Sequence, residues 1–289
     1  MDALIERKEV AARVAEIRDP STRCKAIRYL VELKDSCPYL AELLAETTGV
    51  IDSIFQELAT LYPHLEPHSL TAQMSGSACN ALALLQVIAA DKITRPLFIK
   101  NDYALCILPF LYYVDTSWTF EHLRLASLGV LGSLLKEEDN DEVVIHLIGT
   151  PIIPLCLQIM ERDVTIIMSL ATFVLQKILA SPSGLLHCCA TPERITNVLH
   201  VLNLVVTHLT VYPNSRLLKL VMRCYISMTG NDHAFGLLKH TLPQALRDNT
   251  FDRITGGSIS ADRDWQVLHR ILSNDQDHVK TDTEASTSM

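Results

Sequence analysis

The stretch RLASLGVLGSL, from Arg124 to Leu134, decides how the chain folds. Its apolar residues recur at three- and four-residue spacing, which predicts an amphipathic helix. Gly129 and Gly132 nevertheless lie in its middle, and each glycine costs about 1 kcal/mol of helix stability relative to alanine. A helix that keeps both glycines is expected to have another group packed closely on that side.

A helical projection of this stretch and its flanks separates two faces. One face is predicted to be core and consists of Phe120, Leu123, Leu128, Val130, Leu131, Leu134 and Leu135. The opposite face is neither charged nor bulky and consists of His122, Leu125, Ala126, Gly129, Gly132 and Ser133. A simple surface helix would carry Glu and Lys there. Two interpretations remain: the glycines form the floor of a binding groove, or they pack against a neighbouring helix of the same chain.

Similar apolar helices recur along the sequence. They are ALALLQVI from Ala81, LASLGVLGSL from Leu125, LATFVLQKI from Leu170 and LLKLVMRCYI from Leu217, with starts 44, 45 and 47 residues apart. This period is typical of armadillo or HEAT repeats, although any helical bundle shows some self-similarity. Two further short helices between copies, as at 102–114 and 155–161, favour the three-helix armadillo unit.

The predicted fold class is therefore all-α, an armadillo-type right-handed superhelical solenoid of about six three-helix repeats. The repeat domain is predicted over residues 1–272, and the polar tail over 273–289 is predicted to be disordered. A content of 48% apolar and only 6% aromatic residues agrees with helices packed on helices. The N-terminus lacks a signal-peptide pattern. The sequence contains no long uncharged apolar run, so no membrane span is predicted. The eight cysteines are expected to be reduced, in a cytosolic or nuclear protein.

The third helix of each armadillo unit lines the concave face of such a solenoid. The sequence therefore predicts a partner groove formed by Asn80, Leu84, His122, Leu125, Gly129, Gly132, Phe173, Gln176 and Lys177. Later in the chain, Arg216, Lys219 and Arg223 form a basic stripe. This stripe is either an ordinary solvated face or a site for an acidic partner or, weakly, for nucleic acid. The net charge of −8 argues against nucleic acid as the main ligand.

Motifs for catalysis or metal binding are not found in the sequence. A phosphate loop, a Gly-x-Gly-x-x-Gly turn and a Gly-x-Ser-x-Gly elbow are all absent. His64 and His68 are separated by Pro67, which breaks the helix that would align them. The adjacent cysteines in His187–Cys189 suit a tetrahedral zinc poorly. The sequence predicts no cofactor and no enzyme activity, and an enzyme with scattered catalytic residues is the remaining alternative.

Several long blocks carry a resemblance to a known family. They are DPSTRCKAIRYLVELKDS (Asp19–Ser36), CNALALLQVIA (Cys79–Ala89), FEHLRLASLGVLGSLLK (Phe120–Lys136), IIPLCLQIME (Ile152–Glu161), ATFVLQKIL (Ala171–Leu179), RLLKLVMRCY (Arg216–Tyr225) and LRDNTF (Leu246–Phe251). Over about residues 15–272 the chain resembles the cell-differentiation protein family, the armadillo-repeat subunit of the CCR–NOT mRNA deadenylase complex. Trp265 stands where the family tends to have a tryptophan in its last helix.

The resemblance implies a non-catalytic adaptor. It would be held by a helical segment of the large NOT scaffold subunit, and would recruit peptides of repressor proteins for mRNA decay and translational repression. The family also implies a cytoplasmic location, including mRNA-processing bodies, and a nuclear one, with weak nucleic-acid binding and self-association. Its tryptophan-peptide pocket would lie at Pro192, Glu193 and Arg194, where proline replaces an aromatic residue and predicts weaker capture. The alternative function is a nucleic-acid-binding solenoid in transcriptional or post-transcriptional regulation.

Overall fold

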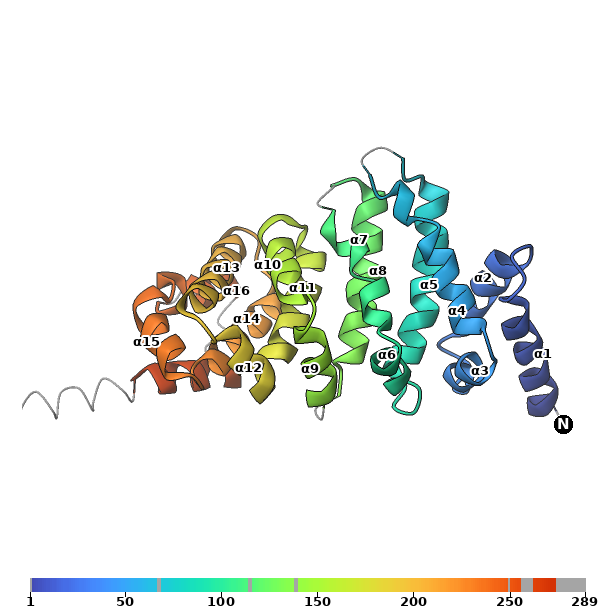
Figure 1. Cartoon of the computed structure of the whole chain (residues 1–289). Coiled ribbons are helices and arrows are strands. Elements are labelled where there is room, and N and C mark those ends of the chain that lie inside the picture. Colours follow the sequence, from blue (N-terminus) through green and yellow to red (C-terminus); the bar gives the residue numbers. More distant parts are fainter. Residues whose placement is uncertain are drawn as a thin grey trace, which may run out of the picture. The chain divides into compact units, whose positions relative to one another are not determined.

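The computed structural model describes residues 2–66, 69–113, 116–137, 140–248, 250–255 and 262–273, and regular structure in these ranges is entirely helical (Figure 1). The chain divides into two compact units. The first consists of Met1–Leu155 and Arg162–Leu170, and the second of Cys156–Glu161 and Ala171–Met289. The prediction of one repeat domain over 1–272 stays a prediction. Ser273 ends the last described helical stretch, and the rest of the predicted tail lies outside the described residues.

The first unit contains α1 (Asp2–Glu16), α2 (Arg23–Leu33), α3 (Leu40–Glu46), α4 (Val50–Ala59), η1 (Tyr62–His64), α5 (Ala72–Ala90), α6 (Pro96–Lys100), η2 (Tyr103–Cys106), α7 (Pro109–Tyr112), α8 (Trp118–Leu134) and α9 (Asp141–Ile148). Residues of α10 (Ile152–Arg162) and α11 (Thr165–Ala180) are divided between the units. The second unit continues with α12 (Pro182–Cys188), α13 (Pro192–Val211), α14 (Ser215–Met228), α15 (Asp232–Thr241), η3 (Gln244–Leu246), α16 (Thr250–Thr255) and the helical stretch 263–273.

No single helix in the described ranges is long and apolar enough to cross a membrane, although two pairs of consecutive helices bent sharply at their junction reach the required length and composition together.

The core of the first unit is built around α5 and α8, which lie side by side (Figure 1) and make its most extensive helix–helix contact. Small residues on α5, including Ala78 and Ala81, are fully buried and let the helices approach closely. At one end of the contact, the buried Ser75 hydroxyl donates a hydrogen bond to the Thr119 carbonyl over 2.8 Å. All seven predicted core residues of α8 are buried.

The four predicted repeat helices share one burial pattern. In each helix, the residues at positions 1, 2, 4, 5, 8 and 9 of a nine-residue pattern are buried. Position 1 of this pattern is Ala81 in α5, Ser127 in α8, Ala171 in α11 and Leu217 in α14. These starts are 46, 44 and 46 residues apart. The repeat starts predicted at Leu125 and Leu170 were therefore out of register by two residues in α8 and by one in α11. The buried phase of α8 passes through Ser127 and leaves Leu125 half-buried.

A short Asp-x-x-Thr-Arg turn links α1 to α2. The Asp19 carboxylate accepts hydrogen bonds from the Ser21 amide and hydroxyl. The Thr22 hydroxyl donates to the carbonyl of Glu16 over 2.8 Å, and Arg23 Nε donates to that of Ile17 over 2.9 Å. These donors satisfy the carbonyls that the end of α1 leaves without helical partners.

The same five-residue pattern follows α5. The Asp91 carboxylate accepts from the Thr94 amide over 2.9 Å. The Thr94 hydroxyl donates to the Ile88 carbonyl over 2.8 Å, and Arg95 Nε donates to the Ala89 carbonyl over 3.2 Å. In both turns, therefore, the threonine and the arginine each bond the carbonyl six residues earlier.

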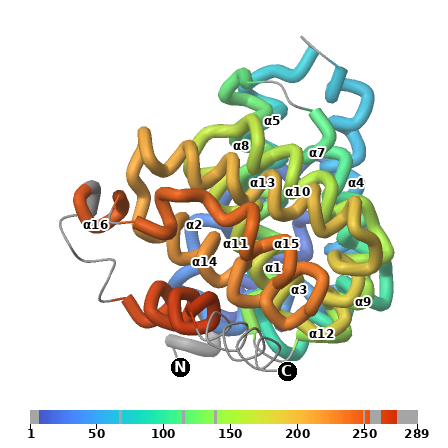
Figure 2. Tube along the Cα trace, turned by 90° about the vertical axis from the view of Figure 1, so that its left-hand side faces the viewer, coloured from blue at the N-terminus to red at the C-terminus, as the bar shows by residue number. Residues whose placement is uncertain are grey.

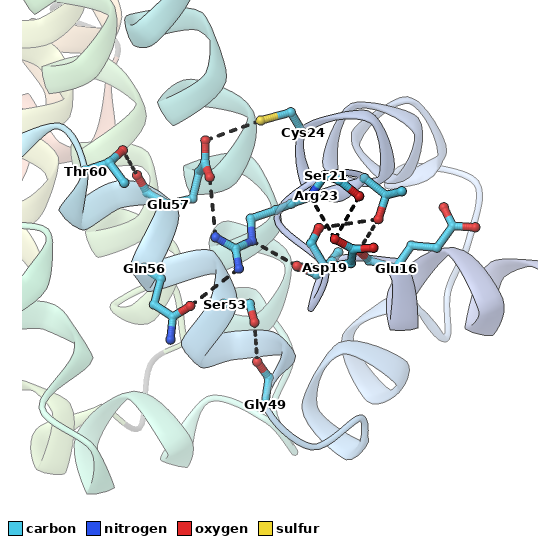
Figure 3. Close-up of polar contacts among 12 residues, drawn as sticks. Glu16, Asp19, Ser21, Arg23, Cys24, Gly49, Ser53, Gln56, Glu57 and Thr60 are labelled. Atoms are coloured by element: carbon cyan, nitrogen blue, oxygen red, sulfur yellow. Dashed lines mark hydrogen bonds and ion pairs between the residues drawn. The ribbon is translucent and has the colours of Figure 1, made fainter.

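Arg23 also joins its turn to α4 (Figure 3). Its guanidinium lies 3.7 Å from the Glu57 carboxylate and 3.4 Å from the Gln56 side-chain oxygen. The neighbouring Cys24 thiol donates to the other Glu57 oxygen over 3.3 Å. This polar cluster uses one buried arginine to hold α1, α2 and α4 together.

Arg124 is the largest fully buried side chain in the described residues. Its Nε lies 2.5 Å from Asp163 Oδ2, and its Nη1 donates to the Tyr113 carbonyl over 2.9 Å. The exposed fractions of the Arg124 and Asp163 side chains are only 1% and 3%. The pair therefore ties α8 to the segment just before α11, within the first unit.

We predict that Arg124→Met lowers the free energy of unfolding by about 3–5 kcal/mol, because Asp163 is left charged and buried without its partner. The double variant Arg124→Met/Asp163→Leu should recover most of that loss, because it removes both charges. Urea unfolding of each variant measures the effect. The control Arg216→Met, at an exposed position, should stay within about 0.5 kcal/mol of the parent. Equal stability of Arg124→Met and this control would contradict the role of the pair.

Candidate partner-binding faces

Each repeat helix turns its third and seventh residues of the shared pattern outward. They are Ala83 and Val87 in α5, Gly129 and Ser133 in α8, Phe173 and Lys177 in α11, and Lys219 and Arg223 in α14. The same structural position is therefore small or aliphatic in the first unit and cationic in α14. We define the first two pairs, with Gln86, as the small-residue face and Lys219 with Arg223 as the cationic face.

A groove lies over the small-residue face. Its cavity has a volume of about 410 Å³ and is lined by Lys34, Asp35, Cys37, Pro38, Ala41, Ala83, Gln86, Val87, Ala90, Asp91, Ser133 and Lys136. Its α5 side combines apolar Ala83, Val87 and Ala90 with polar Gln86 and Asp91, and two lysines and Asp35 stand among the other lining residues. This combination fits a peptide or helix that buries small apolar side chains.

Gly129 lies beside this groove, under the side chain of Gln86. A Cβ built at Gly129 would lie 3.4 Å from Gln86 Oε1, with no backbone of another helix among its nearest neighbours. The close neighbour is therefore a side-chain amide that can move, and Gln86 itself lines the cavity. Gly132, three residues on, is buried and offers no comparable surface. The projection placed it on the outward face because a helical wheel ignores which neighbour covers each position.

The other predicted groove residues of the first unit are divided. Leu84 is fully buried in the core and presents no surface to a partner. Asn80 and Leu125 are half-buried. His122 is exposed, and its Nδ1 donates to the Trp118 carbonyl over 2.6 Å while its ring meets the Trp118 ring edge-on at 5.0 Å. Their assignment to a partner site stays a prediction.

In the second unit, the predicted residues of α11 face outward beside α14. The Lys177 ammonium lies 5.9 Å from the centre of the Phe173 ring, within range of a cation–π contact. Gln176 lines a second cavity of about 550 Å³ together with Lys219 and Arg223. Ile226 and Ser227 of α14 also line this cavity, and the rest of its wall comes from Asp262 and the beginning of the stretch 263–273.

Carboxylates accompany two of the three residues in the predicted basic stripe. Lys219 Nζ lies 2.6 Å from Asp262, and Arg223 Nε lies 2.7 Å from Asp264. The hydrogen bond from Lys219 lowers the pKa of the Asp262 carboxyl below its usual value. Arg216 is exposed and makes no ion pair with the described residues. These pairs were not predicted from the sequence, although the Asp-x-Asp directly before Trp265 is a visible signal.

Pro192, Glu193 and Arg194 begin α13 and are exposed. The Thr191 hydroxyl caps this helix by accepting from the Arg194 amide over 3.3 Å, and Arg194 Nη1 donates to the His187 carbonyl over 3.0 Å. Hydrogen bonds from its own amide and from Thr191 lower the pKa of Glu193. Arg194 thus bonds the end of α12, and the use of the triplet as a peptide pocket stays a prediction.

The cysteines are free thiols, and several belong to the core. Burial raises the pKa of Cys156 and of Cys188 to about 12, which keeps both thiols protonated at neutral pH. Within the described part of the chain, no three His, Cys, Asp or Glu side chains gather in a way that could hold a metal ion.

Comparison with known proteins decides the family. The family model described as "Cell differentiation family, Rcd1-like" matches residues 13–272. The chain belongs to this Rcd1-like family. The resemblance read from the sequence blocks is thereby confirmed.

Two curated yeast proteins are similar to the chain. It is 43% identical to "Protein CAF40" of Saccharomyces cerevisiae over 225 residues, which cover 78% of this chain and 60% of CAF40. It is 40% identical to "Cell differentiation protein rcd1" of Schizosaccharomyces pombe over 241 residues, covering 83% of this chain and 85% of that protein. The match therefore spans less than two thirds of CAF40.

Crystal structures of two engineered proteins share the fold. They superimpose with TM-scores of 0.63 and 0.60 at 14% identity, covering 92% of this chain in both cases and 98% and 97% of theirs. The predicted fold class, all-α and armadillo-type, is confirmed. At this low identity the likeness carries no information on function.

We predict that Gly129→Ala stabilises the chain by up to about 1 kcal/mol, because alanine favours the helix and Gln86 can move aside. Gly184→Ala is the matched opposite, since a Cβ there would overlap the Ile178 carbonyl, and it should cost about 1–3 kcal/mol. Thermal unfolding of both variants measures the difference. If Gly129→Ala destabilises as much as Gly184→Ala, the glycine serves internal packing and not a surface.

Proposed function

We propose that this member of the Rcd1-like family is a non-catalytic adaptor subunit of the CCR–NOT mRNA deadenylase complex. It docks on the large NOT scaffold subunit and recruits peptides of mRNA-repressor proteins for mRNA decay and translational repression. It would act in the cytoplasm, including mRNA-processing bodies, and in the nucleus. The single observation that carries the proposal is the groove over the small-residue face, in a chain of this family.

The groove suits a helical segment of a partner. On α5, the short side chains of Ala83, Val87 and Ala90 form an apolar surface that projects little from the helix. The short side chain of Ser133 projects equally little from α8. Lys34 and Lys136 stand among the lining residues and can hold acidic side chains of the segment. A partner helix could therefore lie close to α5 without displacing bulky side chains.

The chemistry of the described residues supports binding rather than catalysis. The thiols of Cys156 and Cys188, whose pKa values burial raises to about 12, and the Tyr225 hydroxyl, whose pKa burial also raises, belong to buried residues. None of these groups lines either cavity. Strongly perturbed groups that mark active sites usually lie in a cleft, where they can reach a substrate.

Nucleic-acid binding, the alternative function, has weaker support. Two of the three cations in its predicted stripe already face carboxylates, which reduces the positive field that phosphate binding needs.

The proposal predicts that Gly129→Trp abolishes partner binding while the chain stays folded. The tagged chain is purified from its own cells beside this variant, and co-purifying proteins are identified by mass spectrometry. Gly76→Trp is the matched control, because Gly76 also lies on a helix of the first unit and a Cβ there meets no described atom within 4 Å.

We expect the scaffold subunit and the deadenylases to be recovered with the parent and with Gly76→Trp. A partner should be lost only with Gly129→Trp. Absence of the complex from the parent chain would contradict membership of the assembly. An unfolded Gly129→Trp protein, judged by circular dichroism, would contradict the groove.

A further inference from the structure

The helical stretch 263–273 is anchored to the second unit by apolar side chains. Trp265 and Leu268 are buried, and the His269 ring stacks on Trp265 with centroids 4.6 Å apart. In Figure 2 this stretch, in red, lies next to α14, in agreement with the ion pairs between them. These anchors hold the helix independently of the charged residues at its beginning.

Two carboxylates at the beginning of this stretch cover the cationic face. Asp262 pairs with Lys219 and Asp264 with Arg223, at 2.6 and 2.7 Å. The cations lie four residues apart on α14, one helical turn, and the aspartates lie two apart in the sequence. The chain therefore shows which ligand fits this face: two carboxylates separated by one residue.

We propose that the cationic face is a receptor for paired carboxylates, and that Asp262 and Asp264 occupy it until an acidic peptide segment of a partner replaces them. The partner segment would carry two aspartates or glutamates one residue apart. This site belongs to the second unit, and its test needs only the purified chain. The result is therefore independent of the proposed scaffold docking.

The internal pairs are suited to exchange. The Lys219 and Arg223 side chains remain 48% and 53% exposed although they are paired. Their partners Asp262 and Asp264 are 13% and 21% exposed, so water screens each pair from the side of the cation, where a competing carboxylate can also approach. A competing carboxylate can therefore replace Asp262 and Asp264 while Trp265 and Leu268 stay buried.

The surroundings of the pairs favour a peptide over nucleic acid. The adjoining cavity of about 550 Å³ is lined by apolar Ile226 and Val267 as well as by Gln176, Ser227 and Arg263. Apolar side chains of a peptide can be buried there beside its carboxylates. A nucleic acid would instead need a wide positive field, and the whole chain carries a net charge of −8.

The test uses a fluorescent Gly–Ser peptide with Asp-Ser-Asp repeats, titrated with the full chain and followed by anisotropy. The Asp262→Asn/Asp264→Asn variant removes both competing charges. Asparagine keeps the helix cap, in which Asp262 Oδ1 accepts from the Asp264 amide over 2.9 Å. The variant should bind the peptide about tenfold more tightly than the parent at low salt. Adding Lys219→Gln and Arg223→Gln should abolish binding.

Three controls make the result specific. Glu142→Gln/Asp232→Asn makes the same change in net charge at exposed residues elsewhere and should leave the affinity unchanged. A peptide with Asn-Ser-Asn repeats should not bind. In a Trp118→Phe background, Trp265 is the only tryptophan, so its emission shows whether the helix stays docked.

Unchanged peptide affinity in Asp262→Asn/Asp264→Asn, with Trp265 still buried, would overturn the proposal. Tighter binding of a single-stranded oligonucleotide but not of the peptide would overturn it in favour of a phosphate ligand. If the double variant exposes Trp265, the single variant Asp264→Asn, which retains Asp262 as the cap, decides by the same comparison.

Discussion

A guanidinium buried in an apolar core has to be neutralised where it lies, and Arg124 of α8 meets this requirement with Asp163 at 2.5 Å. The pair fixes the segment Arg162–Leu170 to the first unit, although the residues on either side of it, Cys156–Glu161 and those from Ala171 onward, belong to the second. Arg124 belongs to the buried side of α8, and the side that turns outward carries Gly129 and Ser133.

One repeat position thus carries different chemistry along the chain. This position is Ala83 in α5 and Gly129 in α8. Beside these residues lies a groove lined on α5 by the short apolar side chains of Ala83, Val87 and Ala90. In α14 it holds Lys219, which already meets a carboxylate of the same chain. A helical repeat needs only its buried residues to fold, so the outward positions are free to specialise. The two proposed sites therefore differ in chemistry, and we propose a close-packed helix as the partner of one and an acidic segment as the partner of the other.

Periodicity in the sequence was enough to predict the fold class, the four repeat helices and the core face of α8, because burial leaves a regular apolar pattern. It could not predict what lies over each outward residue. Gly132 and Leu84 were assigned to the groove but are buried, since a helical wheel contains no neighbouring helix. The partners of Arg124 and Lys219 are 39 and 43 residues away in sequence, beyond the reach of any local pattern. The repeated Asp-x-x-Thr-Arg turn, by contrast, was visible in the sequence and was overlooked.

Site-specific photo-crosslinking tests whether the small-residue face accepts the proposed scaffold subunit. A benzophenone amino acid replaces Asp35, an exposed residue at the border of the groove, or Glu142, which is exposed on α9, and the chain is irradiated in its own cells. We expect a covalent adduct with the scaffold subunit from position 35 and none from position 142. An adduct from position 142 alone would place the scaffold elsewhere on the chain and contradict docking at this face.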